Sequence, residues 1–438
     1  MKIKDLFSPL LTYCVVSLLI LSPYSFALSE HPWEKIRKER INTLLPKAMN
    51  TANVDAWLVI CRENANDPLA KHVGCENAGQ TAAFIFYQSD NKFASLAFSP
   101  KGEAMALADL GLLDEVTEVE RGANIYQLAA DFVKAKDLKR VAINSSDANK
   151  LADGLSHSQY KKLAKALGTK YIDRLVSSEK LVYEYLAIKL PAEVEIMRQA
   201  AATTAKWQLE AYAQVVPGKT TDRDVALFLK NKMKEAGVGD AWSPDQNPNV
   251  VSGTDRGHSH ATDRVIQPGD VIQTDFGIRV YDTWVTDIQR FAYVLKEGET
   301  KPPKDIAYYW DSAKKGREAA FNAMKPGATG RDVDTAQRDV LTATNSIPVM
   351  WSTGHPVGYV AHDAGPNLGG AYLEPPRPAS LLPLKEGMTF AFDGFHSWLL
   401  PNGKPKTISV EEMVVIAKEG AEYLIPPQQD LVLISQSD

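Results

Sequence analysis

Short apolar runs alternate with amphipathic stretches through the first half of the chain. The runs at 56–60, 82–87, 96–98 and 141–144 are aliphatic and aromatic, and each has the length of a strand. A charged, amphipathic stretch from Trp33 to about Met49 predicts an opening helix, and further helical stretches separate the runs. Strands that alternate with helices favour an α/β layer arrangement for this half.

A long helical pattern then runs from Pro191 to Val216, where Pro217-Gly218 is expected to end it. The chain has 438 residues, more than one domain usually holds. We therefore expect two domains with a boundary near 175–190. The smaller α/β domain would cover 28–185, and a second domain would cover 186–438.

The first 27 residues predict a secretory signal. Lys2 and Lys4 precede an apolar run from Leu10 to Leu21, and Ser25-Phe26-Ala27 offers the small residues that a signal peptidase reads. The run is short for a membrane span, which needs roughly 20 apolar residues; an uncleaved anchor is the alternative. We expect a secreted or periplasmic protein that starts near Leu28 and has no stable membrane span after cleavage.

Charge and cysteine content narrow the classes of function. The formal net charge is −5, with both signs interspersed, so nothing suggests a nucleic-acid partner. Of three cysteines, Cys14 would leave with the signal, and Cys61 and Cys75 would remain. They could form a disulfide in an oxidising compartment or stay as two separate buried thiols. They are too few for a cysteine-based metal site.

The second half of the chain contains an internal duplication. Three motifs recur in the same order, which chance rarely produces. Two related α+β halves would then face each other and deliver equivalent strands to a shared centre. The paired motifs are Pro217-Gly218-Lys219-Thr220 before Asp224-Val225 with Pro326-Gly327-Ala328-Thr329 before Asp332-Val333, Gly257-His258 with Ala361-His362, and Gly269 six residues before Asp275 with Gly387 six residues before Asp393.

Carboxylates interrupt apolar strands at four places in this half. Asp275, Asp287, Asp393 and Glu411 all sit in hydrophobic surroundings, and an unpaired buried carboxylate costs several kcal/mol. Any one of them could lie on a solvated strand face, but a cation explains the set better. His355 adds one imidazole. Oxygen-rich ligation favours manganese, although zinc or cobalt could bind, and four carboxylates fit two divalent ions better than one.

Residues from about 190 to 430 resemble the pita-bread metallopeptidases (family M24), which include methionine aminopeptidase, Xaa-Pro aminopeptidase and prolidase. With the preceding creatinase-N-like α/β domain, the whole chain looks most like the Xaa-Pro aminopeptidase and prolidase branch. The implied fold is an α+β pita-bread catalytic domain. The matching stretches are His258 ahead of Thr262-Asp263-Arg264, Gly269-Asp270, Asp275-Phe276-Gly277, Thr286-Asp287-Ile288, Gly354-His355 through His362-Asp363, Gly387-Met388 and Glu411-Glu412.

The resemblance implies a role for each site residue. The metal ligands would be Asp275, Asp287, His355, Asp393 and Glu411, holding two ions and a bridging hydroxide that attacks the scissile carbonyl. His258 and His362 would contact substrate and help stabilise the oxyanion, and Asp393 would also act as general base. The implied substrates are short proline-containing peptides, cleaved before proline by an aminopeptidase or a dipeptidase. The resemblance also allows a homodimer.

Three positions depart from the family pattern. Asp393 stands where the family usually has Glu, the interval from Asp275 to Asp287 is one residue longer than usual, and Ser409 replaces an arginine. The longer interval implies a bulge or a longer turn. These departures keep an alternative open: a repurposed member of the fold, either a metal-free creatinase-type hydrolase or a non-catalytic binding module. A phosphoester substrate would use the same ions.

Some residue assignments have rivals in the sequence. The spacing to Arg264 favours His258 for its role, and the strand pattern favours Glu411 as the ligand. Three aromatic side chains could shape a pocket for a proline ring or could simply pack in the core, and one further histidine could line the pocket or hold a surface or capping position. The rivals are His260 and Glu412, and the pocket candidates are His396, Tyr281, Trp284 and Trp351.

Overall fold

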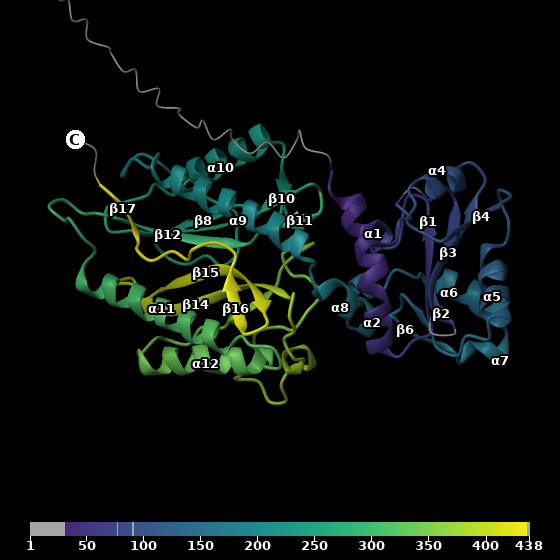
Figure 1. Ribbon diagram of the computed structural model, residues 1–438. Helices are drawn as coiled ribbons and strands as arrows, with labels where there is room; N and C mark the ends of the chain where they lie inside the picture. The colour runs from purple at the N-terminus through teal and green to yellow at the C-terminus, as the bar shows by residue number, and fades with distance from the viewer. Residues whose placement is uncertain (1–30, 77, 90–91, 436–438) are drawn as a thin grey trace, which may run out of the picture.

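The computed structural model describes residues 31–76, 78–89 and 92–435 (Figure 1). The predicted secretory signal lies outside these residues. Among the helices that the described ranges contain, none is both long enough and apolar enough to cross a bilayer.

The N-terminal region is built on one six-stranded mixed sheet, and all four strands expected there are present. Their order across the sheet is β4-β3-β2-β1-β5-β6. β1 pairs antiparallel with β2 and parallel with β5, so the sheet combines a meander with crossover connections. The bounds are β1 Ala56–Arg62, β2 Thr81–Ser89, β3 Lys92–Pro100, β4 Glu115–Val119, β5 Val141–Ile143 and β6 Leu175–Ser177.

The helices of this region cover both faces of the sheet. The single opening helix expected from Trp33 to Met49 is wrong, because the chain breaks at Leu44 into two helices. Pro46 lies in the first turn of the second helix, where its missing N–H costs nothing, whereas it would interrupt one continuous helix. The bounds are α1 Trp33–Thr43, α2 Leu45–Ala52, α3 Ala70–Val73, α4 Glu103–Asp109, α5 Ile125–Ala135, η1 Lys150–Ala152, α6 His157–Leu167, α7 Thr169–Ile172 and α8 Glu179–Ala187.

Side chains of strand β1 pack into two hydrophobic cores, one on each face of the sheet. Trp57 and Val59 point to the face that α1, α2 and α8 cover, and Leu58 and Ile60 point to the face that α5 and α6 cover. The first of these cores continues into the second half of the chain, where it includes Trp284. One face of the N-terminal sheet therefore packs as part of the same core as the C-terminal region.

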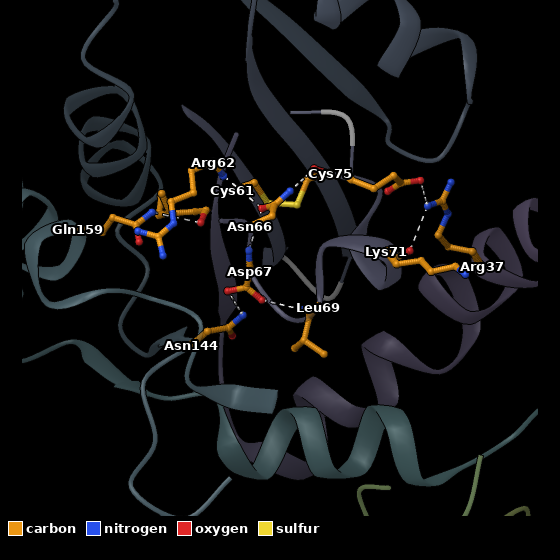
Figure 2. Close-up of a disulfide and its surroundings, with 12 residues drawn as sticks. Arg37, Cys61, Arg62, Asn66, Asp67, Leu69, Lys71, Cys75, Asn144 and Gln159 are labelled. Carbon is orange, nitrogen blue, oxygen red and sulfur yellow. Dashed lines mark hydrogen bonds and ion pairs between the residues drawn. A yellow bond between two sulfur atoms is a disulfide. The ribbon is translucent and has the colours of Figure 1, made fainter. Parts of the chain in front are cut away.

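Cys61 and Cys75 form a disulfide (Figure 2), so the two thiols are not separate. Cys61 lies in β1 and Cys75 follows α3, and their Cα atoms are 6.2 Å apart. The enclosed loop is buttressed by Asp67, whose carboxylate accepts hydrogen bonds from the side chain of Asn144 at 2.9 Å and from the backbone of Leu69 at 2.8 Å. The disulfide thus ties the segment that follows α3 to the end of the interior strand β1.

The C-terminal region contains two four-stranded sheets and a smaller one. The orders are β17-β12-β9-β8, β13-β14-β15-β16 and β11-β10-β7. In Figure 1, α9 and α10 lie on one side of the paired sheets and α11 and α12 on the other. The strands are β7 Gly239–Asp240, β8 Asn249–Ser252, β9 Val271–Phe276, β10 Ile278–Val280, β11 Trp284–Val285, β12 Ile288–Val294, β13 Gly354–Pro356, β14 Thr389–Leu399, β15 Pro405–Ala417, β16 Gly420–Tyr423 and β17 Val432–Ile434.

The helices of this region are α9 Pro191–Tyr212, α10 Asp222–Ala236, α11 Lys304–Ala323, α12 Gly330–Ala343 and the 3₁₀ turn η2 Pro378–Leu381. The long helix is present but ends at Tyr212, four residues before the expected Val216. Residues 213–220 form turns ahead of the next helix, so the long helix ends before it reaches Pro217-Gly218.

The duplication is visible in the hydrogen bonds. Gly269 donates to Val294, which donates back to Asp270; Gly387 donates to Ile416, which donates back to Met388. The helix starts also match, although the paired motifs are offset by one residue. Thr221 caps α10 through Asp224, as Thr329 caps α12 through Asp332. The first copy therefore carries one extra residue after its Pro-Gly.

We predict that replacing both cysteines, Cys61→Ser with Cys75→Ser, lowers the free energy of unfolding by about 2–3 kcal/mol, because the bond closes a loop of about 15 residues. Denaturant unfolding of the oxidised protein against the double variant measures the difference. A reducing agent should destabilise the unmutated protein by the same amount and leave the variant unchanged. Equal midpoints for both proteins would contradict a stabilising bond.

Candidate metal centre

Asp275 lies on one strand of a sheet, and Asp287 directly precedes the neighbouring strand. Asp275 lies in β9, opposite Gln289 of β12, and Asp287 lies in the irregular step just before β12. Between them, β10 and β11 pair so that Val280 faces Trp284, which leaves a three-residue turn. This turn can accommodate the longer interval between the two aspartates.

His355, Asp393 and Glu411 come from the second sheet. Asp393 in β14 lies directly opposite Glu411 in β15, and His355 in β13 lies opposite Ala391. Asp393 thus occupies in this sheet the position that Asp275 occupies in the other. Gly394 follows at a close approach: an added Cβ would lie 2.1 Å from the carbonyl oxygen of Ala313 in α11.

The two sheets bring these side chains together. The Nε2 atom of His355 lies 3.7 Å from Oδ2 of Asp287 and 3.9 Å from Oε1 of Glu411. These three residues offer ligand atoms that all lie within 4.8 Å of one another, which suits one metal ion. Asp275 and Asp393 adjoin this group, because their charges act on Asp287.

Burial and mutual repulsion dominate the electrostatics. Burial raises the pKa of Asp275 to about 6, although His258 and a hydrogen bond with Asp287 oppose the rise. Burial, and then the neighbouring carboxyls, hold the pKa values of Asp287, Asp393 and Glu411 well above their usual range. Without a cation, the protein can keep these groups close only by protonating some of them.

The pKa of His355 shifts in the direction opposite to those of the four acids. Burial, and then the nearby His362, lower the pKa of His355 to about 3. The imidazole is therefore neutral at physiological pH, and its Nε2 lone pair is available because Nδ1 lies 3.2 Å from the carbonyl of Pro356. A neutral imidazole held in this way is a usual metal ligand.

Within the described residues, three carboxylate oxygens of the candidate ligands are buried and have no hydrogen-bond partner: Oδ1 of Asp275, Oδ1 of Asp393 and Oε2 of Glu411. Orphaned buried acceptors are costly, and here they come from three of the candidate ligands. A divalent cation would satisfy them and offset the negative charge. The residues present therefore fit a hard metal ion with oxygen ligands and one nitrogen.

His258 and His362 lie on the solvent side of the carboxylates. Nδ1 of His258 is 3.6 Å from Oδ2 of Asp275, and the ring of His362 lies 4.0 Å from that of His355. Both side chains are exposed, which suits contact with an incoming molecule. His260 is also exposed, but it makes no comparable approach to the centre within the described contacts.

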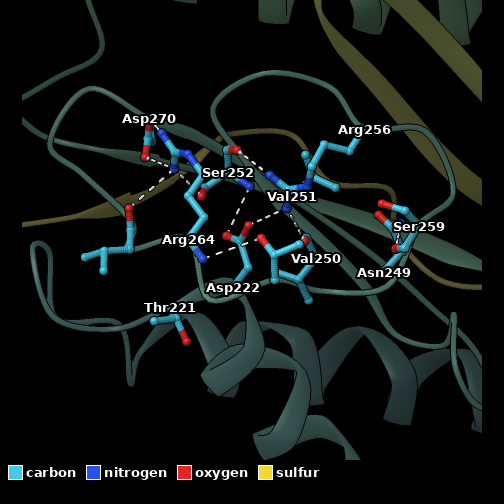
Figure 3. A network of polar contacts seen from close by, with 12 residues as sticks. Thr221, Asp222, Asn249, Val250, Val251, Ser252, Arg256, Ser259, Arg264 and Asp270 are labelled. Atoms are coloured by element: carbon cyan, nitrogen blue, oxygen red, sulfur yellow. Dashed lines mark hydrogen bonds and ion pairs between the residues drawn. The ribbon is translucent and has the colours of Figure 1, made fainter.

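The loop that carries His258 is fixed at several points (Figure 3). At its start, Arg256 donates to Asp222 at 2.5 Å; at its end, Arg264 donates to Asp270 at 2.7 and 3.0 Å. The amide of Asn249 donates to the carbonyls of Gly257 (3.1 Å) and Ser259, on either side of the histidine. A loop held in this way presents the imidazole in a defined position.

The rival residues are engaged elsewhere. Glu412 binds Arg290 through both oxygens, at 3.1 and 3.0 Å. His396 is buried and stacks on Tyr309, with centroids 4.9 Å apart. Trp284 is buried and donates to Glu193.

The two remaining pocket candidates differ. Tyr281 packs edge-on against Trp284, at the turn rather than at the centre. Trp351 is 43% exposed, and its ring lies 5.0 Å from that of His258. Of the aromatic candidates, Trp351 is therefore the one beside the site.

The sequence reasoning missed Gln289. Its Oε1 accepts hydrogen bonds from Ser409 at 2.5 Å and from Gln273 at 2.7 Å, and its side chain also bonds to Glu411. The duplication offered a signal, since Gln289 lies five residues before Val294 and Glu411 lies five before Ile416. Gln289 is therefore the first-copy counterpart of Glu411, and Ser409 joins a neutral network where the family usually has arginine.

The comparisons with known proteins agree with this architecture. The chain is 22% identical to X-Pro aminopeptidase from Thermotoga maritima, with a TM-score of 0.66 over 89% of this chain and 100% of that one. For dipeptidase PepE from Mycobacterium ulcerans the identity is 20% and the TM-score 0.67, over 92% and 99% of the two chains. At these identities the likeness establishes the fold: an N-terminal α/β domain is followed along the chain by an α+β pita-bread domain.

Sequence comparison reaches the same group. The chain is 26% identical over 257 residues to a probable dipeptidase PepE of Mycobacterium bovis, a match that covers 57% of this chain and only 61% of that relative. The model of metallopeptidase family M24 matches residues 195–418, just over half of the chain and the whole stretch that supplies the candidate ligands. The chain belongs to metallopeptidase family M24.

Proposed function

We propose that this protein is a metal-dependent peptidase that hydrolyses the bond preceding proline in short peptides. The observation that carries the proposal is the convergence of four buried carboxylates and one neutral imidazole, with three carboxylate oxygens left unpartnered within the described residues. Solved relatives of the same fold include an X-Pro aminopeptidase and an Xaa-Pro dipeptidase from Bacillus anthracis, which supports the proline preference.

The proposed ligands are Asp275, Asp287, His355, Asp393 and Glu411, and they would hold two divalent ions, of which manganese suits the oxygen-rich set best. When bound, such ions polarise a carbonyl and lower the pKa of water. The ligand count favours two ions, because one ion would leave an excess of buried negative charge.

The protein's own residues supply the rest of the chemistry. His258 and His362 lie on the exposed side, where each ring can donate to the peptide and to the oxyanion that forms. Asp393 has an unpartnered Oδ1 among the candidate ligands and is the proposed carrier of the proton to the leaving amine. Trp351, half-exposed beside His258, offers an apolar face to the substrate.

A secreted or periplasmic location is part of the proposal. The Cys61–Cys75 disulfide is typical of an oxidising compartment and supports it. N-terminal sequencing of the protein from its native host should find a mature chain that begins near Leu28. A full-length chain retained in the cytoplasm would count against this part of the proposal.

The first test measures metal content and activity together. The purified mature protein should contain about two ions per chain and should cleave Xaa-Pro dipeptides or tripeptides until a chelator removes the metal. Product analysis then separates a dipeptidase from an aminopeptidase. No bound metal, and no cleavage after addition of manganese, zinc or cobalt, would instead favour a repurposed member of the fold.

We predict that Asp275→Ala and His355→Ala each abolish metal-dependent hydrolysis without unfolding the protein, because each removes a ligand but leaves the sheets intact. Initial rates and circular dichroism measure the two effects. His157→Ala is the control, since this histidine is exposed at the start of α6, in the N-terminal region. Full activity in a demetallated ligand variant would exclude the proposed chemistry.

The metal-free protein should show the cost of the buried acids in its pH dependence. The folded pKa of Asp275, about 6, lies above its ordinary value of 3.8, so its contribution to stability is present below pH 4 and is lost as the pH rises through 6. Metal-free Asp275→Asn avoids this loss. We predict that it is more stable than the unmutated protein at pH 7.5, by about 1–3 kcal/mol, and no more stable at pH 4.

Urea unfolding in the presence of a chelator measures both differences. Asp311→Asn is the matched control, because this carboxylate on α11 is 60% exposed and lies outside the centre. Added manganese should reverse the order at pH 7.5, since it binds the unmutated site more tightly. A constant difference between the two proteins across pH would refute the electrostatic account.

A further inference from the structure

Tyr359 lies in the segment that joins the two histidines of the centre, four residues after His355 and three before His362. It is buried, with 6% of its surface exposed. Its hydroxyl donates to Oε1 of Glu193 at 2.5 Å, and its backbone N–H donates to Oδ2 of Asp363 at 2.9 Å. Both ends of this residue are therefore bound to carboxylates.

Two cations complete a cluster around Tyr359. Arg40 pairs with Glu193 at 2.5 Å, and its guanidinium lies 5.3 Å from the centre of the tyrosine ring. Lys189 pairs with Asp363 at 3.3 Å, and its ammonium lies 4.7 Å from the same ring. All four charged side chains are at most 1% exposed. We call these five residues the Tyr359 cluster; it holds two positive and two negative charges.

Part of the cluster comes from the N-terminal region. Arg40 belongs to α1, and the same region places Trp33 and His72 edge-on against Tyr359, with centroids 5.9 and 4.6 Å away. Burial, and then Arg40, hold the pKa of His72 well below its usual range, so this histidine is neutral and structural. The N-terminal region thus covers the segment between the two histidines.

The Tyr359 cluster restricts the backbone of the segment between His355 and His362. An added Cβ at Gly358 would lie 2.2 Å from Cε of Lys189, so a larger residue there would displace the lysine from its pair with Asp363. The carbonyl of Gly358 also accepts from the backbone of Val285 at 2.7 Å. Apolar residues could fill such a space with at least equal stability, whereas directional ion pairs select one arrangement of the backbone.

We propose that Arg40 is a positioning residue for His355 and His362. Through Glu193 and Tyr359, the N-terminal domain sets the conformation of the segment that joins the two histidines. The consequence for catalysis rests on the proposed peptidase function; the consequence for the geometry of the histidines does not.

Arg40→Met and Arg37→Met form a matched pair for the test. Both arginines lie in α1 and are buried, but Arg37 binds Lys71 and Glu76 within the N-terminal region. The same substitution in the same helix therefore removes a contact to the catalytic segment in one case only. Tyr359→Phe is a milder third variant, which removes one hydroxyl and keeps the ring.

The first readout is the spectrum of ¹³C-labelled histidine rings in the full-length, metal-free protein, with signals assigned by single His→Gln variants. In Arg40→Met we expect the signals of His355 and His362 to shift or broaden, while that of His157 stays in place. Arg37→Met should leave all three unchanged. If Arg40→Met fails to fold, Tyr359→Phe is expected to move the same two signals by less.

The second readout is steady-state hydrolysis of an Xaa-Pro peptide, well below the melting temperatures of both variants. Displacement of a catalytic group by about 1 Å can cost up to 100-fold, so kcat/KM of Arg40→Met should fall between about 10- and 100-fold and that of Arg37→Met should not. Arg40→Lys should recover part of the loss, because it restores the charge.

Each outcome bears on one of the two proposals. Unmoved histidine signals in folded Arg40→Met and in Tyr359→Phe, or equal shifts in Arg40→Met and Arg37→Met, would overturn the positioning role. If the unmutated protein cleaves no Xaa-Pro peptide with any metal, the proposed function fails, while the histidine spectra still decide the role of Arg40.

Discussion

Four buried carboxylates held close together are the constraint on which the rest of this structure depends. Like charges at such distances cannot all ionise unless a cation or protons compensate them. Without a bound cation, burial raises the pKa values of all four acids. The two sheets are built to impose this proximity: one contributes Asp275 and Asp287, and the other contributes the remaining ligands. Neither half has a complete set, so the site exists only where the halves meet.

Much of this could be read from the sequence, because it depends on local pattern. Apolar runs of strand length predicted four of the six strands described in the N-terminal sheet, and the spacing after Gly269 and Gly387 matched Asp275 with Asp393. What failed was local as well: Pro46 starts a new helix instead of continuing one, and the long helix ends at Tyr212 rather than at Val216. Contacts between segments that are distant in the sequence could not be predicted from local pattern. Nothing near Arg40 in the sequence indicates Tyr359.

The network of Gln289 and Ser409 shows how a departure from a family pattern can be absorbed. Where an arginine would bring a positive charge close to Glu411, this protein places a hydroxyl and two amides that bond to one another. Burial still raises the pKa of Glu411, and the bond from Gln289 lowers it. The ligand keeps a directional partner without a competing cation, so its charge stays available to a metal.

The docking of α1 on the catalytic region also has a consequence for synthesis. The face that carries Trp33 and Arg40 emerges early, but Tyr359, whose ring packs against both side chains, follows roughly 320 residues later. At ~5–20 residues per second, that face waits on the order of 15–65 s for its partner. Glu193, which pairs with Arg40, emerges sooner. Until Tyr359 follows, the indole of Trp33 and the guanidinium of Arg40 lack their aromatic cover, and a chaperone could act on this surface.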